Sequence, residues 1–156
     1  MQLTSQALTD GEAIPLEFAE PSSGGENTIP DLAWSGAPDG TKSYALTVYD
    51  PDAPTGSGFW HWVAFDIPTS VTSIAKGGAL ESPAREWEND YGYKGYGGAA
   101  PPAGRTHRYI HTVHALNVEK LEVPEGATQT QARFMLMAAQ IDSASITPVF
   151  SQPEED

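Results

Sequence analysis

The chain has 156 residues, no cysteine, and a formal net charge of −13 from 21 acidic and 8 basic side chains. This length fits one domain with its own core over residues 1–156. The charge excludes nucleic acid and anionic membranes as general partners, because an acidic surface repels both. No apolar run approaches the roughly 18 residues of a membrane span. The first residues also lack a basic region followed by an apolar run, so the sequence predicts a cytoplasmic protein without integral membrane association.

Three runs rich in β-branched and aromatic residues predict strands at residues 44–49, 60–67 and 109–118. Each run is bounded by Pro, Gly or Asp, and this spacing is typical of a β-sandwich. The first run is apolar at most positions, which predicts a strand that is buried on both faces.

One helix is expected near the C-terminus, from about residue 128 to about residue 142. Thr128 can cap it, and Ala132, Met135, Leu136 and Ala139 recur at helical spacing along one face. After it, residues 145–150 predict a last short strand, and residues 151–156 predict a loose acidic tail.

The chemistry of the chain is concentrated in residues 50–62 and 97–110. Each segment has a Pro/Gly turn that runs into a strand-like run near a histidine, His61 in the first and His107 in the second. If the two turns meet, these imidazoles, the Asp50 carboxylate and the Tyr109 hydroxyl face each other across a hollow with proline walls. Such a hollow is suited to a small polar ligand.

A phosphate-like group needs several donors at once, which turn N–H groups and imidazoles can supply. A carboxylate fits such a site when it bonds one nitrogen of a histidine, because the ring is then oriented and its charged form is favoured. We expect Asp50 to orient either His61 or His107, or to accept from an amine on the ligand.

Other residues in these segments have structural interpretations. Asp52 is expected to bond the backbone of its own turn or to form an ion pair with Arg108. Arg108 alternates with its neighbours, so its side chain faces away from the hollow, as a buried or half-buried ion-pair partner. His111 and His114 are interpreted as ordinary strand residues.

Taken together, Asp-Pro-Asp-Ala-Pro at 50–54, Trp-His-Trp at 60–62 and Pro-Pro-x-Gly-x-x-His-Arg-Tyr at 101–109 resemble the phosphatidylethanolamine-binding protein family. The Raf-kinase-inhibitor-like branch of bacteria and archaea is the most similar. The resemblance implies an all-β fold, an antiparallel Greek-key β-sandwich with one or two short peripheral helices, one of them near the C-terminus. It also implies a ligand pocket formed by Asp50, Pro51, Ala53, Pro54, His61, Gly98, Pro101, Pro102, His107 and Tyr109.

The favoured function is non-enzymatic binding of a small anion or a phosphorylated small molecule, such as a lipid head group, without cofactor or metal. The resemblance adds a regulatory or inhibitory role toward a protein partner such as a kinase or peptidase, and it allows a homodimer. The alternative is a hydrolase or metal-dependent enzyme that uses Asp50, His61 and His107, since two histidines and a carboxylate can hold a metal. A nucleotide site at residues 95–98 is disfavoured, because no Gly-Lys-Ser/Thr follows the glycines.

Overall fold

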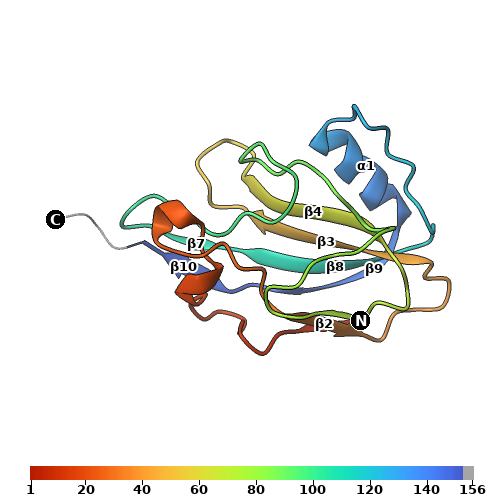
Figure 1. Cartoon of the computed structure of the whole chain (residues 1–156), viewed down its shortest axis with the longest axis horizontal. Coiled ribbons are helices and arrows are strands. Elements are labelled where there is room, and N and C mark those ends of the chain that lie inside the picture. The colour runs from red at the N-terminus through yellow and green to blue at the C-terminus, as the bar shows by residue number, and fades with distance from the viewer. Residues whose placement is uncertain (153–156) are drawn as a thin grey trace.

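The computed structural model describes residues 1–152 (Figure 1). Its centre is a five-stranded antiparallel sheet with the strand order β6-β4-β3-β8-β9. These strands are β3 (Ser43–Asp50), β4 (Phe59–Ile67), β6 (Arg85–Glu86), β8 (Ile110–Leu116) and β9 (Gln140–Ile146). Two smaller sheets are formed by β1 (Gln2–Thr4), β2 (Leu32–Ser35) and β5 (Ser73–Ile74), and by β7 (Thr106–Arg108) and β10 (Val149–Ser151).

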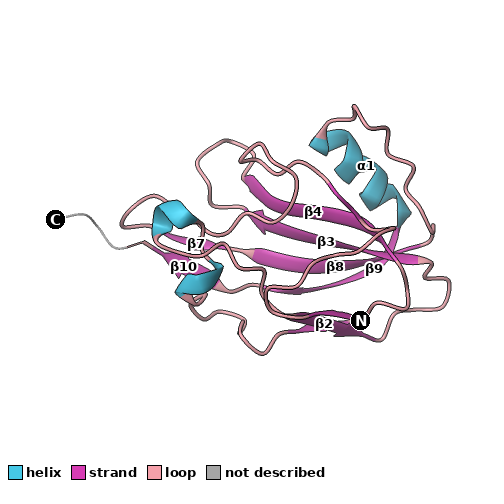
Figure 2. Cartoon of the chain, in the orientation of Figure 1, coloured by secondary structure: helices cyan, strands magenta, loops and turns pink. Residues whose placement is uncertain are grey.

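Helical structure is limited to three segments that lie outside the sheets (Figure 2). They are the helix α1 (Gln129–Ala139) and two single 3₁₀ turns, η1 (Leu16–Phe18) and η2 (Pro21–Ser23). The predicted all-β fold with antiparallel sheets and a helix near the C-terminus is therefore confirmed. No helix among residues 1–152 is long and apolar enough to cross a membrane.

The large sheet is covered on both faces. On one face, Leu46 and Trp62 join a core cluster with Leu3 and Trp34 from the three-stranded sheet. On the other face, a second cluster contains Ala45, Val63 and Phe65 together with Ala132, Leu136 and Ala139 of α1. Figure 1 shows α1 and β2 on opposite sides of the strands of the large sheet. This double cover explains the apolar run of β3, which is buried on both faces as expected.

The helix begins where its cap predicts and ends earlier than expected. The Thr128 side chain accepts a hydrogen bond from the Gln131 backbone, and the Gln131 side chain bonds the Thr128 backbone in return. The expected end near residue 142 was wrong, because Gln140 already has extended backbone angles and begins β9.

The C-terminal strands also differ from the expectation. The predicted strand at 109–118 corresponds to the shorter β8, and a separate strand, β7, precedes it on the other side of Tyr109. Residues 145–150 are shared between β9 and β10. Ser151 belongs to β10 and Gln152 bridges to Ala103, so the tail begins later than residue 151. The rest of the predicted tail lies outside the described residues.

Candidate functional site

A β-bulge in β4 determines where His61 points. The register pairs Val48 with Trp62 and Tyr49 with Trp60, so His61 is an extra residue without a partner on β3. Bulges of this kind redirect a side chain and break the strict alternation of faces. Trp60 packs toward the α1 side and Trp62 into the opposite cluster. His61 lies on the side of Trp62, where its ring makes an edge contact with Tyr109 at 5.2 Å between centroids.

Asp50 and His107 form a buried pair at the end of the sheet. The Nδ1 atom of His107 lies 2.6 Å from an oxygen of Asp50. Because an ionised carboxylate can only accept, Nδ1 donates this bond and Nε2 is left for another partner. The second oxygen of Asp50 accepts from the backbone N–H groups of Asp52 at 2.7 Å and Ala53 at 3.1 Å. Asp50 therefore orients His107 and not His61, and it also closes the turn that follows β3.

His61 is held by the second motif segment. Its Nδ1 lies 2.9 Å from the carbonyl oxygen of Gly97 and 3.1 Å from that of Gly98, so Nδ1 carries the proton and donates to them. Burial lowers the pKa of His61, although the Gly97 carbonyl and the Asp50 charge oppose this shift. The ring is therefore neutral near pH ~7, and its Nε2 is an acceptor.

Tyr109 brings an unpaired hydroxyl to the same place. Its side chain is only 1% exposed, and its hydroxyl oxygen makes no hydrogen bond with any group of residues 1–152. Burial raises the pKa of Tyr109, and the nearby charge of Asp50 raises it further. The hydroxyl thus keeps its proton and remains a donor. Buried polar groups in proteins are rarely left without a partner, so this one marks the site.

The second wall of the site is held in place by two residues that the sequence analysis did not assign to it. The side-chain oxygen of Asn27 accepts from the Gly98 N–H at 2.7 Å, and the Tyr91 hydroxyl donates to the Gly98 carbonyl at 2.7 Å. The Gly98 N–H is thereby occupied within the protein. A Cβ atom on Gly98 would overlap the Phe18 carbonyl, so only glycine fits this close approach.

The predicted prolines differ in their positions. Pro101 is buried and Pro51 is half-buried, whereas Pro54 and Pro102 are exposed. The peptide bond between Ala53 and Pro54 is trans. The expected proline wall is therefore only partly buried with the site residues. By contrast, four predicted site residues are each at most 5% exposed: Asp50, His61, His107 and Tyr109.

Asp52 and Arg108 contact each other outside this buried group. The guanidinium of Arg108 donates to both Asp52 oxygens, through Nη2 at 2.8 Å and through Nε at 3.0 Å. The hydrogen bonds from Arg108 and its positive charge lower the pKa of Asp52 to about 2. The expectation of a buried or half-buried arginine was wrong, because the Arg108 side chain is 57% exposed. It faces solvent since it alternates with the buried His107 on β7.

The remaining histidines lie in the sheet. His111 donates from Nδ1 to the Tyr109 carbonyl at 2.9 Å, and burial lowers the pKa of His111 to about 4. His114 bonds Thr47 and Gln140, so both of its ring nitrogens have partners inside the protein. Across residues 1–152, no three His, Asp or Glu side chains are grouped so that they could hold a metal ion.

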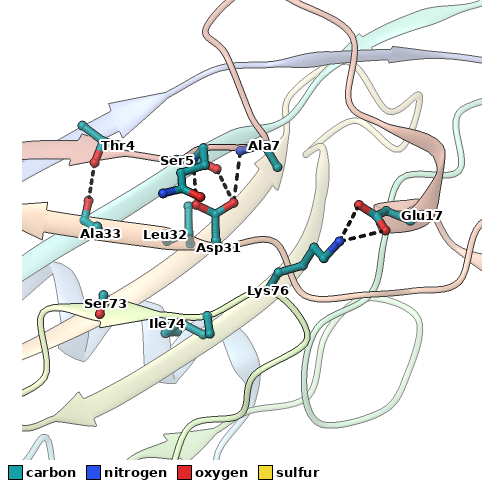
Figure 3. A pocket seen from close by; sticks show the side chains of 12 residues that line it. Thr4, Ser5, Ala7, Glu17, Asp31, Leu32, Ala33, Ser73, Ile74 and Lys76 are labelled. Atoms are coloured by element: carbon teal, nitrogen blue, oxygen red, sulfur yellow. Dashed lines mark hydrogen bonds and ion pairs between the residues drawn. The ribbon is translucent and has the colours of Figure 1, made fainter.

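A hollow of about 770 Å³ lies at the three-stranded sheet, with β1, β2 and β5 along it (Figure 3). Its charged groups are already paired. Asp31 accepts hydrogen bonds from Ser5 and from two backbone N–H groups, which lower its pKa against the opposing effect of burial. Lys76 pairs with Glu17 at 3.4 Å. These contacts make this hollow a weaker candidate than the group around Asp50.

The arrangement around Asp50 therefore brings three polar atoms together. Tyr109 offers a hydroxyl proton, His107 offers the Nε2 atom that Asp50 leaves free, and neutral His61 offers a lone pair. A partly protonated oxyanion satisfies all three, because its charged oxygens accept while its own hydroxyl can donate to His61.

Comparisons with known proteins show which proteins this chain resembles. The sequence profile described as Phosphatidylethanolamine-binding protein matches residues 4–151. The UPF0098 protein YbhB of Escherichia coli is 45% identical, over 97% of this chain and all of YbhB. The crystal structure of E. coli YbcL, 44% identical, superposes with a TM-score of 0.90 over 96% of this chain and 97% of that one. The crystal structure of CT736 of Chlamydia trachomatis, 31% identical, superposes with a TM-score of 0.83 over 99% of this chain and 97% of that one.

The profile spans nearly the whole chain, and the first two relatives exceed 40% identity along their length. Asp50 and His107, which form the buried pair, both lie within the residues that the profile matches. The chain belongs to the phosphatidylethanolamine-binding protein family, in the branch that includes YbhB and YbcL.

Proposed function

We propose that the protein binds a small anion, or the phosphate group of a phosphorylated small molecule, between Tyr109, His107 and His61, without changing it chemically. The observation that carries the proposal is the buried Tyr109 hydroxyl, which has no hydrogen-bond partner within residues 1–152. A buried hydroxyl without a partner costs about 1–3 kcal/mol. An oxyanion that accepts from Tyr109 would offset this cost.

Only local hydrogen-bond donors favour an anion at this site. The whole chain carries −13, so the general field opposes anion binding. The Asp50 carboxylate is already used by His107 and by two backbone N–H groups. It therefore acts on the ligand through His107, whose ring it orients, and it is a poor acceptor for a ligand amine.

The enclosure of the site favours a small ligand. Asp50, His61 and His107 are each at least 95% buried, so only a compact group can reach them without movement of the turns. Phosphate, or the terminal phosphate of a larger molecule whose remainder stays outside, has the required size and acceptors. The ligand chemistry is therefore that of a phosphate group, free or attached.

Calorimetric titration with inorganic phosphate, phosphoethanolamine and glycerol phosphate tests the proposal. His107→Gln should weaken phosphate binding by about 10- to 150-fold, the equivalent of a charge-assisted hydrogen bond of about 1.5–3 kcal/mol. Arg105→Ala, which removes an exposed cation of the same loop, is the control and should change affinity little. Equal losses in both variants would indicate a diffuse charge effect and contradict the site.

The enzyme alternative has a separate test. A panel of phosphate esters incubated with the protein and Zn²⁺ or Mn²⁺ should show no turnover above the rate of the His107→Gln variant. Turnover that requires His107 would contradict non-enzymatic binding, while the anion site itself would stand.

A further inference from the structure

A second bulge in β4 redirects the side chain of Asp66. Near its end, β4 again has one residue more than β3 between two paired positions, so Phe65 and Asp66 lie opposite a single residue of β3. Asp66 has a φ of 60°, in the left-handed region that side chains seldom adopt. Phe65 packs into the core cluster on the α1 side, and Ile67 packs into the cluster on the other face. Asp66 belongs to neither cluster and lines a hollow instead, as bulges that redirect a side chain allow.

Asp66 is a buried carboxylate with one unused oxygen. The residue is only 3% exposed, and its Oδ1 accepts a hydrogen bond from the Leu121 N–H at 2.9 Å. The Oδ2 atom forms no hydrogen bond or ion pair with any group of the described chain. It is not sealed in the core, because the two fully enclosed side-chain atoms without a partner lie elsewhere in residues 1–152. Burial raises the pKa of Asp66, although the Leu121 N–H, Arg85 and Lys120 oppose this shift. The protein itself therefore compensates this carboxylate incompletely.

The hollow beside Asp66 is small. Its volume of about 270 Å³ is just below the roughly 300–1,000 Å³ of most small-molecule pockets. Pro68 and Pro83 line it with rigid rings that carry no N–H donor. The other lining residues are exposed and polar, namely Lys42, Thr69, Glu119 and Lys120. A ligand in this hollow can have only a few heavy atoms.

The two lysines of the hollow have no acidic partner. The chain has four lysines among its 8 basic residues, against 21 acidic ones. Two of these lysines pair with glutamates elsewhere. Lys42 and Lys120 form no ion pair within the part of the chain that the structure describes. Their long, flexible stems allow both ammonium groups to approach a ligand in the hollow.

The charges of the hollow select the chemistry of its ligand. Asp66 and Glu119 balance Lys42 and Lys120, so the lining carries both signs and no net charge. A simple cation would be attracted by the buried carboxylate and repelled by the two ammonium groups, and a simple anion would experience the reverse. A zwitterion satisfies both signs. We propose that this hollow binds a small amino acid, with its ammonium group on Oδ2 of Asp66 and its carboxylate toward Lys42 and Lys120.

This site is separate from the proposed anion site. Lys42 directly precedes β3 and Asp66 lies near the end of β4, whereas Asp50 ends β3 and His61 lies near the start of β4. Because the two strands are antiparallel, the two sites lie at opposite ends of the large sheet. The amino acid site therefore does not depend on the proposed function, and both sites can be filled at the same time.

NMR titration of the full chain with glycine tests the site. The Leu121 amide reports on it directly, because its N–H donates to Asp66. Glycine should shift this amide resonance saturably, with a dissociation constant in the millimolar range, since the ligand has few atoms. Acetate and ethylamine each carry only one of the two charged groups and should bind at least about tenfold more weakly. No saturable shift with glycine, or equal binding of acetate or ethylamine, would overturn the proposal.

Asp66→Asn removes the charge and preserves the local structure. Asparagine also tolerates a positive φ, and its side-chain oxygen can still accept from the Leu121 N–H. Glycine binding should weaken by at least about tenfold in this variant. Asp52→Asn is the matched control, because it removes the same charge outside the hollow and should leave glycine affinity unchanged. Equal losses in the two variants would indicate a general charge effect and contradict the site.

A variant with both Lys42→Gln and Lys120→Gln tests the other half of the site. Both lysines are exposed, so this variant folds independently of the outcome at Asp66. Without the two ammonium groups, the carboxylate of glycine is attracted less and ethylamine is repelled less. The preference for glycine over ethylamine should therefore fall by about threefold or more. An unaltered preference would contradict the amino acid assignment.

Discussion

Replacing Tyr109 by phenylalanine removes a single oxygen atom, and its effects on folding and on binding should have opposite signs. In the free protein the hydroxyl is buried without a hydrogen bond inside residues 1–152. In a phosphate complex the same hydroxyl would donate to a charged oxygen. Tyr109→Phe should therefore stabilise the free protein slightly and weaken phosphate binding.

The magnitudes follow from the burial of the side chain, which is 1% exposed. Relief of part of the desolvation cost of about 1–3 kcal/mol should raise the stability of the free protein by up to about 1 kcal/mol. For a domain of this size, that corresponds to an increase in Tm of about 2–4 °C. Loss of a hydrogen bond to a charged group should weaken phosphate binding by about 10- to 150-fold.

Thermal unfolding without phosphate and calorimetric titration with phosphate measure the two effects separately. Tyr96→Phe is a matched control, because the buried Tyr96 hydroxyl donates to the Phe18 carbonyl at 2.8 Å. Its removal should lower the Tm, by leaving that carbonyl without its partner, and should leave phosphate affinity nearly unchanged.

One pattern of results would refute the reasoning. If Tyr109→Phe destabilised the free protein as Tyr96→Phe does, and left phosphate affinity unchanged, the hydroxyl would have a structural partner. The Asp50 carboxylate and the Ala100 backbone are the groups that could be this partner. The Tyr109 hydroxyl would then belong to the fold and not to the ligand site.

The remaining predictions concern packing and pH. Gly98→Ala should destabilise the protein by at least about 1–3 kcal/mol in urea unfolding, because the added methyl group overlaps the Phe18 carbonyl; wild-type stability would contradict the close approach. The pKa of His111 is about 4 in the folded state because of burial, against about 6.5 when unfolded, so the unfolded state binds more protons between these values. The free energy of unfolding should therefore fall as pH drops from about 6.5 to about 4. His111→Gln should reduce this pH dependence by on the order of 1.4 kcal/mol per pH unit. An unchanged pH dependence in the variant would mean that another group titrates. Asp52→Asn should cost less than about 1 kcal/mol near neutral pH, because the pair with Arg108 is largely exposed. Arg108 lowers the pKa of Asp52 to about 2, so the stability difference between the unmodified chain and Asp52→Asn should persist down to pH ~4 and disappear toward pH ~2. Unfolding curves across that pH range would measure it.

Local signals explain which elements the sequence predicted. The apolar run of β3 and the cap at Thr128 depend on neighbouring residues, and both were located correctly. The end of α1 was missed because the apolar residues continue past Ala139, while the chain turns into β9 through its pairing with β8. The strand β9 has the polar sequence QIDSASI with alternate exposed residues, so its sheet pairing and not its composition defines it.

Several residues of the candidate site could be named from the sequence, whereas the contacts between them could not. Asp50 and His107 were both named, but their pairing depends on the register that places Tyr49 opposite Ile110 in β3 and β8. The roles of Asn27 and Tyr91 depend on hydrogen bonds to Gly98, which are formed only after the chain has folded. No property of either residue in the linear sequence distinguishes it from an ordinary loop residue.

The extra residue at His61 in β4 makes the candidate site sensitive to deletions in this stretch of the strand. His61 reaches the side of Trp62 only because β4 has one residue more than β3 between two paired positions. Shortening this stretch by one residue would restore regular alternation, so that the histidine would project toward Trp60 and α1. Length changes in the exposed turn at residues 54–57 would leave that register intact. Between relatives, insertions and deletions should therefore accumulate in the turn, whereas the number of residues from 59 to 63 should stay fixed.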